Sequence, residues 1–395
     1  MASIVFAWEL GGHTGHVTTL LPVARAMRSR GHEVRFLLRD LKSGADLAGA
    51  SEIARAAAPI WVGPARYANP HNFGQILHNF GYQLPDSVRQ LIDAWRERLQ
   101  GADAVIANVA PAAHIAARTL CIPSFEISQG FHVPPPTMPA PPLRHWEPAS
   151  RAELEAADRA VLAAVNATLV AHGAASIGTI GDLFAGRAML LTYPELDVYP
   201  ERGPADYYGV PKSGEGSAVP EWPAGRGPRV FGYLYSYFAG LEPLLAALER
   251  LQARTLLLCR GANAELVRKH AGGSVQVMNE PMSVSRVLPQ SDIVVGHGSH
   301  QMTAQSLLAG KPLLMLPTQL EQFLIMRRVV RFGAGLGIDP SVPDADYAKA
   351  LQELTASTFV QKAQAFAQRY AAHDPDAALA TMIGRVESAL QRRVA

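Results

Sequence analysis

Apolar runs and glycine-rich turns alternate at the start of the chain in the order of a βαβ unit. Residues 4–8 are continuously apolar, which predicts a buried strand, and a turn rich in glycine and histidine follows. Apolar positions then recur every three to four residues over 18–30, which predicts an amphipathic helix. Gly31 ends that helix, and residues 34–38 form the next predicted strand.

The same pattern returns over residues 291–322. A short apolar run breaks at Gly296, His297, Gly298 and Ser299, a helical stretch passes through 305–309, and residues 313–316 are apolar again. In open α/β sheets, ligands bind beyond the carboxyl ends of strands, where the next helix presents free N–H groups to a phosphate. We therefore expect a phosphate-bearing ligand beside His297; a plain βα turn with a structural histidine is the alternative.

Two such units far apart in the chain predict an α/β fold with two Rossmann-like parallel-sheet domains. Further strands are predicted at 104–108, 122–127, 229–234, 255–259 and 274–278. Further helices are predicted at 112–120, 151–172, 241–251, 345–370 and 375–392.

Glycine, proline and serine dominate residues 207–228, which predicts a linker. We expect an N-terminal domain over 1–206, a C-terminal domain over 229–373 and a final helix over 374–395. The apolar stripe of that helix must pack on something, with the first domain as a candidate, or lie on a membrane surface. Its polar face is mixed rather than lysine-rich, which favours packing.

Two irregular segments interrupt the first domain. Residues 61–82 interleave aromatic side chains with histidines and asparagines, which is typical either of a small-molecule site or of aromatics that fill a core beneath a loop. Residues 131–142 are dense in proline and predict an extended loop, which we interpret as the stiff rim of a cleft.

Composition narrows the class of protein. The 395 residues are 48% hydrophobic and 18% charged, and the net charge of +2 comes without any basic block, so a nucleic-acid partner is not expected. Two cysteines without metal-ligand spacing predict free thiols in a reducing cytoplasm. The N-terminus lacks the charged segment of a signal peptide, and no apolar run is long enough to predict a membrane span.

Three segments together resemble the GT-B glycosyltransferases of the UDP-glycosyltransferase type, which include plant natural-product enzymes and bacterial macrolide glycosyltransferases. They are GHTGHVTTLLPVARAMRSRGHEV, LLTYPELDVYPER, and LPQSDIVVGHGSHQMTAQSLLAGKP followed by LPTQLEQ. The resemblance covers nearly the whole chain. It implies two Rossmann-like domains facing each other across a cleft, and inverting transfer of a sugar from a UDP- or dTDP-sugar to a hydroxyl of an apolar small molecule or lipid. No metal or other cofactor is implied.

The resemblance places the general base at His16, because the family's histidine follows the first strand. An imidazole there can take the proton that an attacking alcohol loses. The family orients this base with an aspartate, where this chain has Asn108, which can fix the ring but supplies no charge. Either Glu9 or Glu126 replaces the carboxylate, or the acceptor is acidic enough to need less help, or the protein no longer catalyses.

The resemblance also assigns the donor side. His297, Gly298 and Ser299 would face the diphosphate, with Gln301 and Met302 beside them; Met302 cannot donate a hydrogen bond, so backbone amides would carry more of the binding. Gln305 would hold the ribose, and Glu321 with Gln322 the sugar. Asn279 stands where plant members place a tryptophan that stacks on the nucleotide base, so the resemblance does not distinguish uracil from thymine.

The expected acceptor side combines aromatics of the first domain with one histidine. The residues are His13, Phe73, Phe80, Tyr82 and Phe131. Two alternatives to a transferase remain: a catalytically silent protein that binds a sugar nucleotide or assists a partner enzyme, and a sugar-nucleotide epimerase or hydrolase. The aromatics disfavour the last, because such enzymes need no separate apolar acceptor pocket.

Overall fold

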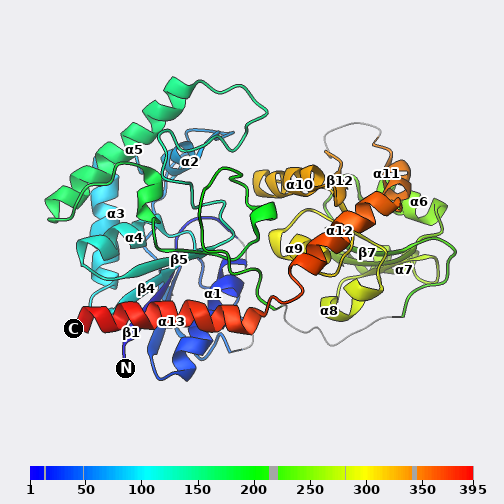
Figure 1. The fold of residues 1–395 in the computed structure, drawn as a ribbon, viewed down its shortest axis with the longest axis horizontal. Coiled ribbons are helices and arrows are strands. Elements are labelled where there is room, and N and C mark those ends of the chain that lie inside the picture. Colours follow the sequence, from blue (N-terminus) through cyan, green and yellow to red (C-terminus); the bar gives the residue numbers. More distant parts are fainter. Residues whose placement is uncertain (13–14, 48, 213–220, 281, 340–344, 395) are drawn as a thin grey trace. The chain divides into compact units, whose positions relative to one another are not determined.

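The computed structural model describes residues 1–12, 15–47, 49–212, 221–280, 282–339 and 345–394. The chain forms two compact units. The first contains 1–192, 199–211 and 375–395, and the second contains 193–198 and 212–374. Figure 1 shows each unit as a sheet flanked by helices.

The first unit is built on a six-stranded parallel sheet in the order β3-β2-β1-β4-β5-β6. Its strands are β1 (Ser3–Trp8), β2 (Glu33–Leu38), β3 (Ala54–Ala57), β4 (Ala104–Ala107), β5 (Ser124–Ser128) and β6 (Ala188–Leu190). Its helices are α1 (Gly15–Ser29), α2 (Phe73–His78), α3 (Pro85–Arg98), α4 (Pro111–Thr119), α5 (Arg151–Ala171), the short 3-10 helix η1 (Ile180–Leu183) and α13 (Pro375–Val394).

Strand β1 is apolar from Ile4 to Trp8 because both faces of the sheet are covered. Val5 and Ala7 enter one hydrophobic core, whereas Ile4, Phe6 and Trp8 enter the core on the opposite face. This alternation follows from the two-residue repeat of a strand, and continuous apolar runs are typical of parallel sheets buried on both sides.

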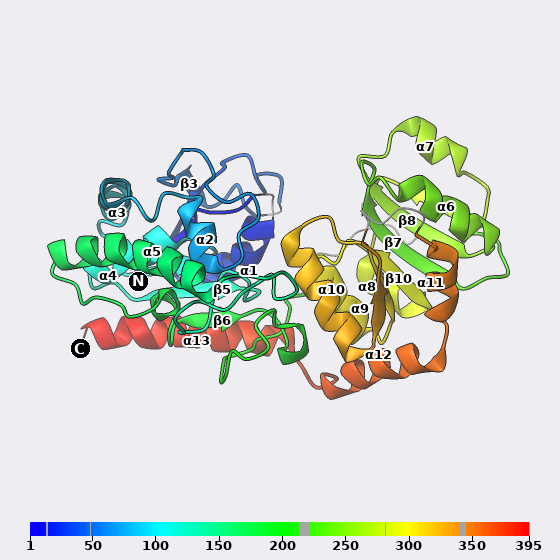
Figure 2. The ribbon, with the colours of Figure 1, turned by 90° about the horizontal axis from the view of Figure 1, so that it is seen from above.

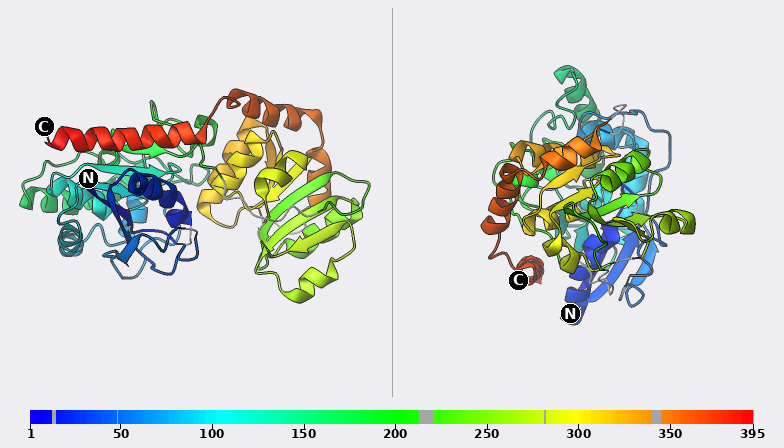
Figure 3. Two further views of the ribbon diagram at one scale, coloured as in Figure 1. Left: turned by 90° about the horizontal axis from the view of Figure 1, so that it is seen from below. Right: turned by 90° about the vertical axis from the view of Figure 1, so that its right-hand side faces the viewer.

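Helix α13 belongs to the first unit, where it runs along the same side as α1 (Figure 3, left). Four side chains of its apolar stripe are buried in the core that also contains Phe6: Met382, Ile383, Val386 and Leu390. Arg385 donates to Asp206 at 2.7 Å. The stripe is therefore covered by protein, which is the packing alternative rather than the membrane-surface one.

The second unit repeats the topology, with the order β12-β11-β10-β7-β8-β9. Its strands are β7 (Arg229–Tyr235), β8 (Arg254–Arg260), β9 (Val275–Met278), β10 (Ile293–Gly296), β11 (Leu313–Met315) and β12 (Gly335–Gly337). Its helices are η2 (Pro194–Leu196), α6 (Leu241–Arg250), α7 (Ala264–Lys269), α8 (Val284–Val287), η3 (Leu288–Gln290), α9 (His300–Leu308), α10 (Leu320–Phe332), α11 (Tyr347–Glu353) and α12 (Ser357–Arg369). Helices lie on both faces of this sheet (Figure 2).

The strand order reverses in each sheet between its two central strands. The reversal falls between β1 and β4 in the first unit and between β7 and β10 in the second. Ligands of doubly wound sheets bind beyond the carboxyl ends of strands at such a switch point. The predicted residues His16 and Asn108 follow β1 and β4, and His297 follows β10.

The segment 193–198 was expected in the first domain but packs with the second unit. The Glu195 carboxylate accepts a hydrogen bond from Tyr370 at 2.7 Å and is paired with Arg369, while Arg328 donates to the Glu195 carbonyl at 3.1 Å. Tyr193 lies against the ring of Phe366 at 5.2 Å.

Two predicted elements differ in detail. Residues 61–82 contain the short helix α2, which begins where the Asn72 side chain accepts from the Gln75 amide. Residues 345–370 contain two helices: α11 ends at Glu353, the Thr355 hydroxyl just beyond it donates to the Gln352 carbonyl, and α12 begins at Ser357. Within the described ranges, no helix is long and apolar enough to cross a membrane.

Candidate functional site

His16 lies in the first turn of α1, just beyond the carboxyl end of β1. Its partly exposed ring stacks on Trp8, with 4.8 Å between ring centres and 18° between planes. Gly11 approaches the ring at Nε2: a Cβ there would lie 2.6 Å from Nε2 of His16, and Gly11 has a φ of +87°. The loop therefore uses glycine because only that residue fits so close to the imidazole.

The amide of Asn108 fixes the protonation pattern of His16. Oδ1 of Asn108 lies 2.5 Å from Nδ1 of His16, and Nδ2 donates to the carbonyl of Ile127. The carbonyl of Ile127 can only accept, so the amide nitrogen must face it and the amide oxygen must face His16. An oxygen at that position requires a proton on Nδ1, which leaves the lone pair of the neutral ring on Nε2.

Neither glutamate proposed as a substitute carboxylate performs that role. The two oxygens of Glu9 accept from Tyr82 at 2.6 Å and from the Ala112 amide at 2.9 Å. Oε1 of Glu126 accepts from the Val109 amide at 2.7 Å, and Oε2 of Glu126 lies 2.9 Å from Nε2 of His114. Burial raises the pKa of Glu9 to about 8 and also raises the pKa of Glu126.

His132 is a residue of this region that sequence reasoning missed. Its ring lies 4.6 Å from that of Phe131 and 6.1 Å from that of Phe73. Burial, and secondarily the nearby His16, lower the pKa of His132 to about 3, so it is neutral at physiological pH. A single histidine in a proline-dense loop carries no periodic signal that would have identified it.

The predicted acceptor residues do not form one surface. Phe73 and Tyr82 are fully buried in the core, where Phe73 meets Phe184 and Tyr82 binds Glu9, so the core interpretation of this segment applies to them. Phe131 is buried, and Phe80 is partly exposed with the Arg39 guanidinium 5.9 Å from its ring. His13 lies outside the described residues.

In the second unit, the ring of His297 joins the ends of three strands. Its Nδ1 donates to the carbonyl of Leu316 at 2.8 Å, and its Nε2 accepts from the amide of Tyr235 at 3.1 Å. Both nitrogens are therefore used by backbone groups, and burial lowers the pKa of the ring. The contact of this ring with a diphosphate, expected from the sequence, stays a prediction.

The turn after His297 brings the two donor segments together. Gly298 has a φ of +86°, and a Cβ there would lie 3.0 Å from the carbonyl oxygen of Gln322. Ser299 precedes α9 and makes no side-chain cap bond, so the helix N-terminus is not covered by its hydroxyl. Gln301 and Gln305 lie four residues apart on α9, which places both partly exposed side chains on one face.

Glu321 and Gln322 begin α10 with different environments. Oε1 of Gln322 accepts from the amide of Thr318 at 2.8 Å and from its hydroxyl at 3.0 Å, which orients the amide. Glu321 is partly buried, and desolvation raises its pKa to about 7. A carboxyl group poised near neutrality can either accept from or donate to a sugar hydroxyl.

His300, at the first position of α9, was also missed. His300 is buried, and desolvation lowers its pKa to about 4, although the negative charge of Asp197 acts in the opposite direction and raises the pKa. The residue is therefore a neutral imidazole beside the predicted diphosphate turn. Only the packing of 193–198 on this unit brings the aspartate near it, a relationship that the sequence does not reveal.

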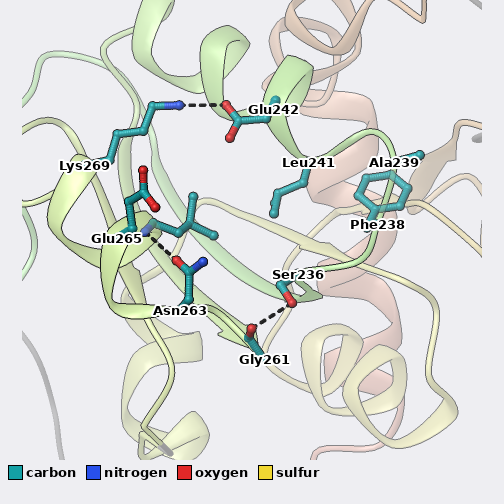
Figure 4. A pocket seen from close by; sticks show the side chains of 10 residues that line it. Ser236, Phe238, Ala239, Leu241, Glu242, Gly261, Asn263, Glu265 and Lys269 are labelled. Carbon is teal, nitrogen blue, oxygen red and sulfur yellow. Dashed lines mark hydrogen bonds and ion pairs between the residues drawn. The ribbon is translucent and has the colours of Figure 1, made fainter.

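A pocket of about 430 Å³ opens beyond the carboxyl ends of β7 and β8 (Figure 4). Ser236 and Gly261 join its two walls through a hydrogen bond of 2.9 Å, and Lys269 pairs with Glu242 at its rim at 3.0 Å. None of the predicted donor residues lines it. Among the described residues, no group of three or more His, Cys, Asp or Glu side chains is arranged to hold a metal ion.

Comparison with known proteins identifies the fold. No protein-family model and no curated protein matches the chain. Among solved structures, the glycosyltransferase VinC in complex with dTDP is 17% identical, covers 99% of this chain and 100% of its own, and has a TM-score of 0.69. The spinosyn rhamnosyltransferase SpnG complexed with spinosyn aglycone is 17% identical, with coverages of 97% and 100% and a TM-score of 0.66.

The glycosyltransferase SnogD from Streptomyces nogalater is 19% identical, with coverages of 97% and 99% and a TM-score of 0.63. These similarities extend over both chains almost completely. The predicted fold class, two Rossmann-like parallel-sheet domains of the GT-B type, is confirmed.

Proposed function

We propose that this chain is an inverting glycosyltransferase that moves a sugar from a nucleoside-diphosphate sugar to a hydroxyl of an apolar small molecule. The observation that carries the proposal is the hydrogen bond between His16 and Asn108, which leaves the lone pair of the imidazole on Nε2. The structural similarity to known glycosyltransferases supports the same reaction class.

In the proposed reaction, Nε2 of His16 takes the proton of the acceptor hydroxyl as its oxygen attacks the anomeric carbon. The new glycosidic C–O bond forms while the bond from the anomeric carbon to the diphosphate breaks. The nucleoside diphosphate leaves with the electron pair. Attack opposite to the leaving group inverts the anomeric centre.

Asn108 fixes the tautomer of His16 but supplies no negative charge to stabilise the imidazolium. Because Glu9 and Glu126 are bonded elsewhere, the chain needs another source of driving force. We propose that the acceptor hydroxyl is more acidic than an ordinary alcohol, as a phenol is. Proton transfer to a neutral histidine is then less demanding.

We assign the donor to the second unit. Backbone groups of Gly298 and Ser299 and the N-terminus of α9 would meet the diphosphate, and Gln305 the ribose. Glu321 and Gln322 would bind the sugar. The glycosyltransferase VinC was solved in complex with dTDP, which supports a dTDP-sugar ahead of a UDP-sugar as the donor. We expect transfer to need no metal ion, to be insensitive to a chelator and to take place in the cytoplasm.

The test is acceptor-dependent release of nucleotide from a panel of dTDP- and UDP-sugars, with the mass of the acceptor followed in parallel. The panel should include phenolic and aliphatic alcohols of similar size. The proposal predicts release that needs an acceptor, a matching gain of one glycosyl unit and loss of both in His16→Ala. Nucleotide release without an acceptor product would indicate a hydrolase instead.

A protein that binds a sugar nucleotide without transferring it is the second candidate. Two residues favour it: Asn108 carries no charge beside the base, and the side chain of Met302 cannot donate a hydrogen bond in the first turn of α9. This alternative predicts saturable donor binding in calorimetry and no product with any acceptor. Product formation with a single acceptor would exclude it.

A further inference from the structure

Val109, the residue after Asn108, has an unusual backbone conformation. Its φ is +56°, in the left-handed region, which a β-branched residue rarely adopts. Such residues persist only where the surroundings hold them in place. Val109 is buried, so the contacts that keep it in this conformation must come from protein groups rather than from solvent.

Glu126 on the neighbouring strand β5 provides the main side-chain contact to the backbone of Val109. The amide of Val109 donates to Oε1 of Glu126 at 2.7 Å, and the Val109 carbonyl accepts from the Leu10 amide at 2.9 Å. The other oxygen of Glu126 lies 2.9 Å from Nε2 of His114, whose Nδ1 lies 3.0 Å from the Ser124 hydroxyl. The carboxylate is therefore fixed at both oxygens within the buried sheet.

These bonds act on both members of the His16 and Asn108 pair. The Val109 amide belongs to the peptide plane that leaves the Cα of Asn108, so Glu126 fixes the backbone on that side. The backbone N–H of Asn108 donates to the Ala7 carbonyl at 2.9 Å and fixes the backbone on the N-terminal side of Asn108. Through Leu10, Val109 is also tied to the loop that reaches His16.

We propose that Glu126 is a positioning residue that holds Val109 in its left-handed conformation and so aims the side-chain oxygen Oδ1 of Asn108 at Nδ1 of His16. The inference rests on the proposed function of His16 as a base. It differs from the direct carboxylate partner expected from the sequence, because Glu126 acts through the backbone of Val109.

The first test reads the His16 tautomer by ¹⁵N NMR, without turnover. The wild-type protein and Glu126→Gln should show a single Nδ1–H tautomer, because the glutamine oxygen still accepts from Val109 and its amide can face His114. Glu126→Ala should show a mixture of tautomers. Ser124→Ala, which removes the far end of the network, should lower the melting temperature but keep the single tautomer.

The second test is a double-mutant cycle on the rate of transfer. Glu126→Ala should lower kcat about ten-fold, the loss of one well-oriented hydrogen bond, with the KM for the donor unchanged. In an Asn108→Ala background the same change should have no further effect. If Glu126→Ala does not fold, Glu126→Leu fills a similar volume without accepting a bond and replaces it in both tests.

An unchanged His16 tautomer in Glu126→Ala or Glu126→Leu would overturn the proposal, as would an equal loss of kcat in both backgrounds. Failure of the proposed function gives a different result. The tautomer would still respond to Glu126, while no variant, including the wild type, would form product.

Discussion

Nδ1 of His16 and Oδ1 of Asn108 lie 2.5 Å apart, and the carbonyl of Ile127 prevents the amide from turning round. The pair resembles the histidine and carboxylate of many hydrolytic and transfer sites in geometry, but an uncharged amide takes the place of the carboxylate. The orientation of the base is therefore separated from the stabilisation of its charge.

Removing the side-chain amide of Asn108 should leave the His16 ring without its oriented hydrogen-bond partner. Asn108→Ala should lower kcat by about ten- to a hundred-fold, because His16 loses both its preferred tautomer and its orientation. The KM for the donor should stay within about two-fold. Steady-state kinetics with a fixed acceptor measure both, and an equal change in the two constants would contradict a role in the chemical step.

Asn108→Asp should retain more activity than Asn108→Ala, because the carboxylate still accepts from Nδ1 and adds charge next to the imidazolium. It should nevertheless cost stability, since its second oxygen faces the Ile127 carbonyl where the amide now donates. We expect the free energy of unfolding to fall by about 1–3 kcal/mol in urea titrations at neutral pH. A variant as stable as the wild type would show that the Ile127 bond is dispensable.

The close approach of Gly11 to the base predicts a sharp difference between neighbouring glycines. Gly11→Ala places a methyl group 2.6 Å from the Nε2 position and strains a φ of +87°, so His16 must move and transfer should fall at least ten-fold. Gly12→Ala is the matched control, because none of the described residues has an atom within 4 Å of its Cβ position. Equal rates for the two variants would show that His16 does not need its present place.

Burial of Glu9 predicts a dependence of stability on pH. Its pKa is raised to about 8, so the folded protein favours the protonated carboxyl group. This contribution is complete below the unfolded pKa of about 4.5 and is lost as the pH rises through 8. The full loss is on the order of 5 kcal/mol.

Glu9→Gln should remove that slope, because an amide can donate to Tyr82 and accept from Ala112 without titrating. Urea unfolding at pH 5, 7 and 8.5 compares the two proteins. If the wild type and the variant lose stability in parallel over this range, the carboxyl group of Glu9 does not have the raised pKa.

On the donor side, the partly buried carboxyl of Glu321 should matter for the sugar. Glu321→Ala should raise the KM for the sugar nucleotide by about ten-fold and leave the affinity for the free nucleoside diphosphate unchanged. Calorimetry with both ligands separates the two effects. An equal loss of affinity for both ligands would contradict a contact between Glu321 and the sugar.

The sequence located His16, Asn108 and His297 because each follows a predicted strand at a glycine turn or strand end, and strand ends of a parallel sheet meet at one edge. It could not predict which atoms they contact. His297 binds backbone groups of two other strands, and that depends on strand order and register rather than on local pattern.

The partners of Glu9 and Glu126 were unpredictable for a related reason. Glu9 follows the end of β1 and Glu126 lies within β5, and side-chain direction sends the first to Tyr82 and the second to His114. The left-handed Val109 carries no sequence signal at all, because a valine in an apolar run reads as an ordinary strand residue.

The most direct measurement is the rate of sugar transfer by His16→Ala beside its affinity for the donor. We expect a donor dissociation constant within about two-fold of the wild type, because the predicted donor residues belong to the second unit. We expect kcat to fall by about a hundred- to ten-thousand-fold, the usual contribution of a general base. Wild-type turnover in His16→Ala would contradict the assignment of His16 as the base.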